Sequence, residues 1–187
     1  MRIVLLRHGK PDVPAHGKLK AHEIPRWIES YNSSGIALDH EPPKEAIKIA
    51  KSCNTVVCSD LPRSTESAQA LGVKRIDIVE PVFREMGLPY TTLPSPKLSP
   101  NIWSAIFRVL WLFGYSSNGE SISEAKDRAG RGARWLSEMA MDSGSVLLVG
   151  HGFVNRFIAK ELKSNGWQGP GNPGKQFWEF GVYEYAT

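Results

Sequence analysis

Short apolar runs rich in β-branched residues alternate along this chain with segments whose apolar residues recur at helical spacing. The strand-like runs lie at 3–6, 55–58, 76–79 and 145–149. Runs of this length and composition are typical of strands that are buried on both faces. Because helices between successive strands give crossover connections, the alternation predicts an α/β protein with a mostly parallel sheet.

The remaining segments complete this pattern in one domain over 1–187. Pro42 and Pro43 can open a helix, and Ser121 and Glu124 form a capping box that starts a long helix ended by Gly144. Four prolines within 89–100 predict an irregular loop, and an apolar run follows at 102–113. We therefore expect 89–118 to be a lid insertion. Helices are also predicted at 21–31, from Pro62 to Gly72 and at 153–163. A loop is predicted at 9–20, and a strand that closes one edge of the sheet is predicted within 175–185.

Composition and charge exclude several classes of protein. A content of 41% hydrophobic residues in 187 excludes wholesale disorder, and two cysteines are too few for a disulfide scaffold. Their C-x4-C spacing, without a second pair, is also a poor zinc site. The net charge of +4 and the pI of about 9.1 favour anionic partners. The basic residues are dispersed, so we expect no nucleic-acid partner.

Neither apolar run suits a membrane or a secretory signal. The first run, at 3–6, is followed directly by Arg7 and His8 and is too short for a signal peptide. The run at 102–113 is too short to span a bilayer and contains Arg108. We therefore expect a cytoplasmic protein without membrane contact.

Polar residues gather where the predicted strands end. Arg7, His8 and Gly9 follow the first strand, and Ser59 follows the second, with Arg63 about one helical turn further on. His151 stands between two glycines after the strand at 145–149, and Arg84 and Glu85 follow the strand at 76–79. Ligands in open parallel sheets bind beyond the carboxyl ends of the strands, so these residues are expected at one site.

This set of residues suits phosphoryl transfer. Guanidinium groups bind phosphate oxygens through several planar donors, and glycine lets the backbone approach closely. A neutral imidazole can attack phosphorus, and flanking arginines should keep it unprotonated. A carboxylic acid can protonate the leaving alkoxide.

Four motifs, in order and at strand ends, resemble those of the histidine phosphatase superfamily, also called phosphoglycerate mutase-like. They read LLRHGKP at 5–11, SDLPRSTESA at 59–68, FREMG at 83–87 and GHG at 150–152, and GES at 119–121 resembles the turn before the family's long helix. The resemblance covers 1 to about 157. It implies a three-layer α/β/α sandwich with a mostly parallel central sheet and a small helical cap or lid.

The resemblance also implies roles for individual residues. His8 is the expected nucleophile, Glu85 the proton donor, and His151 a catalytic residue that also binds the substrate phosphate. Arg7, Arg63 and Gly9 complete the phosphate site. No metal or organic cofactor is implied, and the expected partner is a small phosphomonoester; a homodimer through the aromatic segment or the tail strand also stays open.

Alternatives remain at the level of function. A mutase-type phosphotransferase would share the catalytic residues, but the asparagine- and tryptophan-containing stretch that such mutases carry after the RHG motif is absent from 10–20. A non-catalytic phosphate- or phosphopeptide-binding module is the other alternative. We interpret the chain as a phosphatase that acts through a phosphohistidine.

Alternatives also remain for single residues. Glu66, Glu80 and Glu120 are other candidates for the proton donor. Cys58 and Arg63 are one residue short of the C-x5-R loop of cysteine phosphatases, so Cys58 is expected to be a buried strand residue. Ser64, Ser67 and Lys10 depart from the family pattern, and Lys10 would add a cation beside the phosphate site. The aromatic residues of 102–113 are expected to pack in the core or cap, with a lid over the substrate's organic part as the alternative.

Overall fold

The computed structural model describes residues 1–13 and 17–186, so residues 14–16 of the predicted loop at 9–20 lie outside the described part. Within it, one sheet has the order β3-β2-β4-β1-β5. The strands β1, β4, β2 and β3 are parallel, and β5 runs antiparallel along β1 as the predicted closing edge. The strands are β1 (Arg2–Arg7), β2 (Thr55–Cys58), β3 (Ile78–Val79), β4 (Ser145–Gly150) and β5 (Phe180–Glu184).

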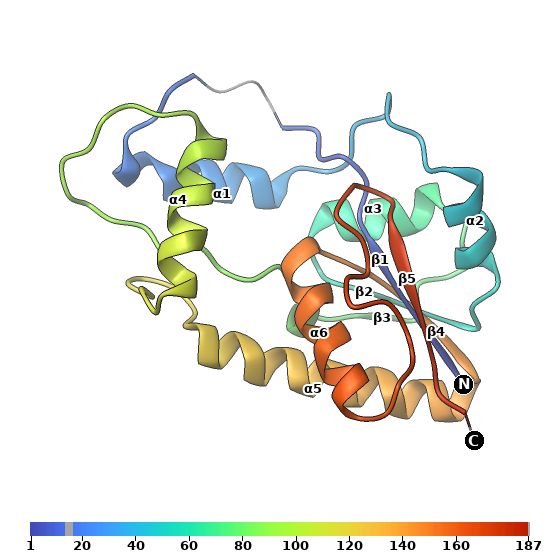
Figure 1. Cartoon of the computed structure of the whole chain (residues 1–187). Coiled ribbons are helices and arrows are strands. Elements are labelled where there is room, and N and C mark those ends of the chain that lie inside the picture. Colours follow the sequence, from blue (N-terminus) through green and yellow to red (C-terminus); the bar gives the residue numbers. More distant parts are fainter. Residues whose placement is uncertain (14–16, 187) are drawn as a thin grey trace.

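Helices cover both faces of this sheet, which confirms the three-layer α/β/α architecture (Figure 1). Ile3 and Leu5 of β1 pack with α5 and α6, whereas Val4 and Leu6 point to the opposite face and pack with α2 and α3. This alternation is the two-residue period of a strand buried on both faces. The helical elements are η1 (Ala21–Glu23), α1 (Ile24–Ser33), α2 (Lys44–Lys51), α3 (Pro62–Ala70), η2 (Pro81–Phe83), α4 (Pro100–Leu112), α5 (Ile122–Ser143) and α6 (Gly152–Ser164).

Local sequence signals set the ends of these elements. At the start of α5, the Ser121 hydroxyl accepts from the Glu124 amide, and the Glu124 carboxylate accepts from the Ser121 amide at 2.8 Å. Gly144 ends the helix with a φ of +80°, which glycine adopts without strain. None of the helices in the described part is both long and apolar enough to cross a bilayer.

The edge strand β3 is shorter than the predicted strand at 76–79. The Asp77 carboxylate accepts a hydrogen bond from the Val56 amide at 2.8 Å, so a side chain takes the place of a main-chain partner. Regular pairing therefore begins only at Ile78, opposite Val57. At the other border, Gln168 forms an isolated bridge to Glu184 of β5.

The cap has an apolar cluster of its own. Ala21, Ile24, Trp103 and Phe107 are buried together, joining α1 and α4 at one end of the molecule (Figure 1). This packing confirms a small helical cap, to which α4 of the segment 89–118 belongs. That 89–118 is an insertion stays a prediction. The aromatic residues of α4 face this cluster and the core, as the packing interpretation expected.

Strand register brings the expected site residues to one edge of the sheet. Arg7 lies opposite Gly150, and Cys58 lies opposite Val149. The residues that follow, His8, Ser59 and His151, therefore leave the sheet at the same level.

Candidate active site

His8 is buried directly after β1, with 2% of its surface exposed. Its Nδ1 lies 2.6 Å from the carbonyl oxygen of Gly9. Because a carbonyl oxygen only accepts, Nδ1 carries the hydrogen and Nε2 keeps a free lone pair. Burial lowers the pKa of His8 to about 3, and Arg63 contributes less. The imidazole is therefore neutral as expected, but burial is a stronger cause than the arginines to which we had attributed it.

His151 lies beside His8 at the junction of β4 and α6. The two ring centres are 4.9 Å apart in an edge-on arrangement. Nε2 of His151 lies 2.7 Å from Oγ of Ser59, and Oγ also accepts from the Leu61 amide at 3.4 Å. When the hydroxyl of Ser59 donates its hydrogen to Nε2, the imidazole hydrogen lies on Nδ1. Nδ1 is buried and has no partner among the described residues.

Arg7 and Arg63 bring two guanidinium groups to the same place. Arg63 is 1% exposed and donates to the carbonyl oxygen of Tyr31 at 3.2 Å and to Oδ1 of Asn32 at 3.3 Å. Arg7 donates to the carbonyl oxygen of Lys175, and its guanidinium carbon lies 4.5 Å from the centre of the Phe177 ring. Within the described chain, neither arginine has a carboxylate partner at ion-pair distance. Arg63 is thus no surface ion-pair residue.

Unpaired donors are the main electrostatic feature of this site. Nε of Arg7, Nε of Arg63 and Nδ1 of His151 are each buried without a partner in the described part of the chain. A buried polar group without a hydrogen bond is costly, and a buried cation without a counter-charge more so. An oxyanion with several oxygens would satisfy all three donors, so the site suits phosphate.

Glu85 is the acidic residue that the structure brings to these groups. Its carboxylate accepts from the amides of Met86 at 3.0 Å, Phe153 at 3.1 Å and Val154 at 3.0 Å, and so lies at the first turn of α6. A Cβ built on Gly152 would lie 3.6 Å from Cζ of Arg7 and 3.7 Å from Oε2 of Glu85. Glu85 and Arg7 thus approach the same side of Gly152.

The other acidic candidates lie elsewhere. Glu66 accepts from the Ile36 amide at 2.8 Å, and Glu120 pairs with Arg128 at 2.6 Å. Neither they nor Glu80 line the cavity described below, whereas Glu85 does.

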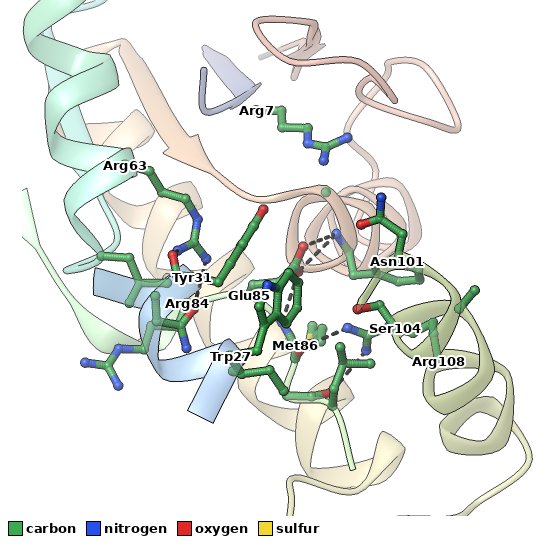
Figure 2. Close-up of a pocket in the computed structure, with 18 of the residues that line it drawn as sticks. Arg7, Trp27, Tyr31, Arg63, Arg84, Glu85, Met86, Asn101, Ser104 and Arg108 are labelled. Atoms are coloured by element: carbon green, nitrogen blue, oxygen red, sulfur yellow. Dashed lines mark hydrogen bonds between the residues drawn. The ribbon is translucent and has the colours of Figure 1, made fainter. Parts of the chain in front are cut away.

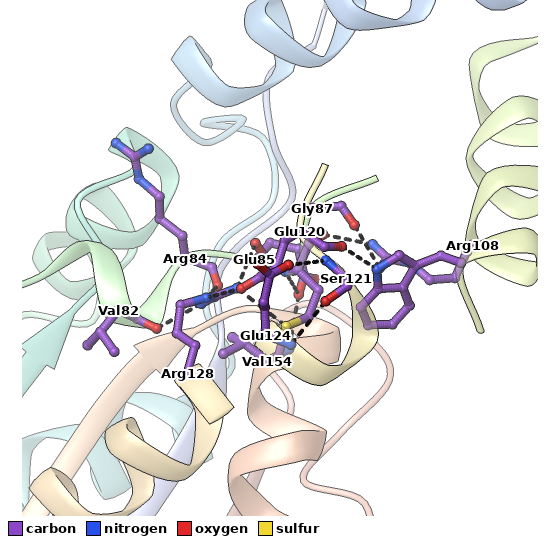
Figure 3. Close-up of polar contacts among 12 residues, drawn as sticks. Val82, Arg84, Glu85, Gly87, Arg108, Glu120, Ser121, Glu124, Arg128 and Val154 are labelled. Carbon is purple, nitrogen blue, oxygen red and sulfur yellow. Dashed lines mark hydrogen bonds and ion pairs between the residues drawn. The ribbon is translucent and has the colours of Figure 1, made fainter. Parts of the chain in front are cut away.

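Arg128 of α5 holds the segment that carries Glu85 (Figure 3). It donates to the carbonyl oxygens of Val82 and Arg84 at 2.8 Å each, while Glu120 neutralises its charge. The role of Arg128 could not be predicted from the sequence, because nothing in the helical spacing of α5 shows that this position meets the loop after β3.

A cavity of about 460 Å³ opens between this site and the cap. Figure 2 shows Arg63 and Arg84 on one side of Glu85, and Arg108 with Asn101 and Ser104 of α4 on the other. The aromatic part of its wall comes from Trp27 and Tyr31 of α1 and Phe153 of α6, and not from Trp103, Phe107 or Trp111. His8 and His151 are buried next to the wall formed by Arg7 and Arg63 and are not part of it.

The remaining expected residues have other surroundings. The Gly9 amide donates to Oγ of Ser67 at 2.8 Å, and a Cβ on Gly9 would lie 2.2 Å from the Trp178 ring. Close packing thus requires glycine here, and its role in phosphate binding stays a prediction. Lys10 is exposed and lies outside the cavity wall. Burial raises the pKa of the Cys58 thiol to about 12, which disfavours a thiolate nucleophile.

Comparison with known proteins agrees with this geometry. The family model described as histidine phosphatase superfamily (branch 1) matches residues 3–174. No curated protein matches the sequence.

Solved structures with a similar fold have low sequence identity. One is the product of the open reading frame Rv3214 from Mycobacterium tuberculosis (TM-score 0.62, 18% identity, covering 100% of this chain and 95% of that one). Another is a putative alpha-ribazole-5'-P phosphatase from Escherichia coli (TM-score 0.57, 20% identity, covering 86% of this chain and 78% of that one). A third is a mycobacterial glucosyl-3-phosphoglycerate phosphatase in complex with VO3 (TM-score 0.56, 20% identity, covering 97% of this chain and 91% of that one). At these identities the likeness concerns the fold.

Proposed function

Because this chain belongs to the histidine phosphatase superfamily (branch 1), we propose that it hydrolyses small organic phosphomonoesters through a phosphohistidine on His8. One observation carries the proposal above all others. A buried, neutral imidazole with a free Nε2 lies beside three buried donors that have no partner among the described residues. Two of the solved structures with this fold are described as phosphatases, which also favours hydrolysis over other phosphoryl transfers.

In the first step the phosphoryl group enters between Arg7 and Arg63. Nε2 of His8 attacks phosphorus, and the bond from phosphorus to the ester oxygen breaks. Glu85, as the acid, gives its proton to the departing alkoxide. The guanidinium groups and the Nδ1–H of His151 bind the phosphoryl oxygens as charge builds up on them.

In the second step water attacks the phosphohistidine. The carboxylate of Glu85 takes a proton from this water, the phosphorus–nitrogen bond breaks, and inorganic phosphate leaves. Ser59 acts as a positioning residue, since its bond to Nε2 fixes the tautomer and orientation of His151.

Rapid-quench labelling tests this function. Mixing the protein with a ³²P-labelled phosphomonoester should give an acid-labile, base-stable adduct on His8 and then free phosphate. His8→Ala should abolish the adduct, whereas His22→Ala, at an exposed position, should retain it. Transfer of the label to a second hydroxyl without release of phosphate would indicate the mutase alternative, and binding without an adduct would indicate a phosphate-binding module.

A further inference from the structure

The cavity carries more positive charge than one phosphoryl group requires. Arginines at five positions line it, and Glu85 is the one acid in its wall among the described residues. Arg7 and Arg63 belong to the phosphate site, and Arg84 is neutralised by Asp60 at 2.6 Å. Neither Arg108 nor Arg156 then forms an ion pair with a carboxylate of the described residues, although Glu85 and Glu120 act on Arg108 electrostatically from a longer distance.

Arg108 is held in a fixed position at the cap end of the cavity. It donates to the carbonyl oxygens of Met86 at 2.9 Å and Gly87 at 3.2 Å. Its guanidinium carbon lies 4.3 Å from the centre of the Phe153 ring and 4.9 Å from that of Trp111. The two carbonyls and two rings fix its direction, and carbonyl dipoles do not neutralise a full charge. Figure 2 shows Arg108 near Met86, and Figure 3 shows it near Gly87.

Arg156 has fewer contacts than Arg108. It lies on α6, and its guanidinium carbon is 5.2 Å from the centre of the same Phe153 ring. Its Nε is buried without a partner, and its side chain makes no hydrogen bond or ion pair with any residue that the structure describes. Two cations therefore share the Phe153 ring in the wall of the cavity, and neither pairs with a carboxylate among the described residues.

We propose that Arg108 and Arg156 form a second anion subsite, so that the substrate carries a further carboxylate or phosphate group remote from the scissile ester. Delocalised oxyanions match guanidinium donors, and a desolvated cation gains most from such a partner. The spacer between the two anionic groups packs against the apolar wall formed by Trp27, Ile28 and Leu88. This inference rests on the proposed function for the identity of the first group.

Binding of non-hydrolysable ligands tests the subsite without relying on turnover. The probes are alkylphosphonates with two to six methylene groups that end in a carboxylate, a second phosphonate or, as the neutral control, a carboxamide. Titration calorimetry should show that at least one anionic end group binds at least tenfold more tightly than the amide of equal length. Which anionic end group binds better identifies the natural one.

Variants assign this preference to its residues. Arg156→Gln should reduce the ratio of anion to amide affinity to below threefold, and Arg156→Lys should restore part of it. Arg131→Gln, which removes an exposed arginine of α5 outside this cavity, should leave the ratio unchanged. Because both ligands carry the same phosphonate, a general loss of phosphonate affinity leaves this ratio unchanged. Circular dichroism checks that each variant is folded.

Two results would overturn the subsite: equal affinity of anion and amide at every length, or an unchanged ratio in Arg156→Gln. The proposed function fails separately. If the anionic phosphonates bind selectively but no phosphomonoester is hydrolysed, the subsite stands and the phosphatase does not.

Discussion

At the scale of single residues, Glu85 has the most demanding of the proposed roles, because in that mechanism it first donates and then accepts a proton. Glu85→Gln keeps the size of the side chain but removes this proton transfer. We expect hydrolysis of alkyl phosphates to fall by about 10²–10⁴-fold, the usual contribution of general acid catalysis. Nitrophenyl phosphate should lose less than about tenfold, since its leaving group needs little protonation. Comparison of kcat/KM for the two esters checks this, and equal losses would remove Glu85 from the acid role.

The buried imidazole of His8 should also affect stability. Folded His8 stays neutral down to its pKa of about 3, whereas in the unfolded chain it takes up a proton below about pH 6.5. Acidification from pH 6.5 towards 3 therefore favours the unfolded state, by up to about 1.4 kcal/mol per pH unit for each such histidine. Above pH 6.5 this contribution does not change with pH.

Denaturant unfolding between pH 5 and 6.5 measures this effect. The slope of unfolding free energy against pH should be smaller in His8→Asn than in the unmodified protein. His22→Asn, at an exposed position, should keep the original slope. An unchanged slope in His8→Asn would show that His8 takes up its proton in the folded protein.

At the scale of elements, the first turn of α6 organises the site, because His151 caps it, and it contains Gly152 and two of the three amides bound by Glu85. Gly152→Ala would place a methyl group at ordinary contact distance from Arg7 and Glu85, 3.6 and 3.7 Å away. The fold should tolerate it, but the methyl group takes space beside the expected phosphate. We expect KM for phosphomonoesters to rise at least tenfold.

The matched control for this change is Gly130→Ala on α5, where the nearest atom to a new Cβ is Nη1 of Arg134 at 3.8 Å. It should leave kcat and KM unchanged and raise the unfolding free energy by up to about 1 kcal/mol, since alanine is the better helix former. Thermal unfolding and steady-state kinetics on both variants check the pair. Normal kinetics in Gly152→Ala would place the phosphate elsewhere.

The residues of the candidate active site could be predicted from sequence because strand ends position them. His8, His151 and Arg63 follow apolar runs whose period and length indicate buried strands, and parallel register then brings them to one edge. Arg108 and Arg156 could not be predicted in this way. Their surroundings depend on how α4 packs against α1 and on which side of α6 meets the cap, and helical spacing alone does not fix either.

At the scale of the whole molecule, the cap has an apolar cluster of its own besides the two that hold the sheet, and Trp111 of α4 connects it to one of those two. Phe107→Ala removes a buried ring from the cap cluster, a change that costs about 3–5 kcal/mol where packing is tight. Because cooperative units of this kind can open locally, faster amide exchange should be confined to α1, η1 and α4. Hydrogen exchange followed by mass spectrometry measures it.

Leu148→Ala, in the centre of β4, is the comparison variant for Phe107→Ala. It should speed amide exchange throughout the sheet and not only in the cap. If Phe107→Ala loosens β1 and β4 to the same extent, the cap and the sheet form one cooperative unit.

Self-association around Trp103 or through the tail strand stays an open alternative. Trp103 itself is buried and donates to the carbonyl oxygen of Leu19 at 2.8 Å. The exposed large apolar residues of α4 are instead Ile102, Ile106, Val109, Leu110 and Leu112, and Phe113 lies exposed just after the helix.

The two borders of the sheet have a consequence for the protein at high concentration. On one side β3 offers only two residues of regular ladder, and on the other Gln168 already exchanges both main-chain hydrogen bonds with Glu184. An extended segment of another polypeptide thus finds only two ladder residues at the β3 border, and at the β5 border the main chain of Glu184 is already paired and Gly169 lies against Val182. Such blunted borders hinder growth into cross-β fibrils, so crowding alone should not drive this fold toward amyloid.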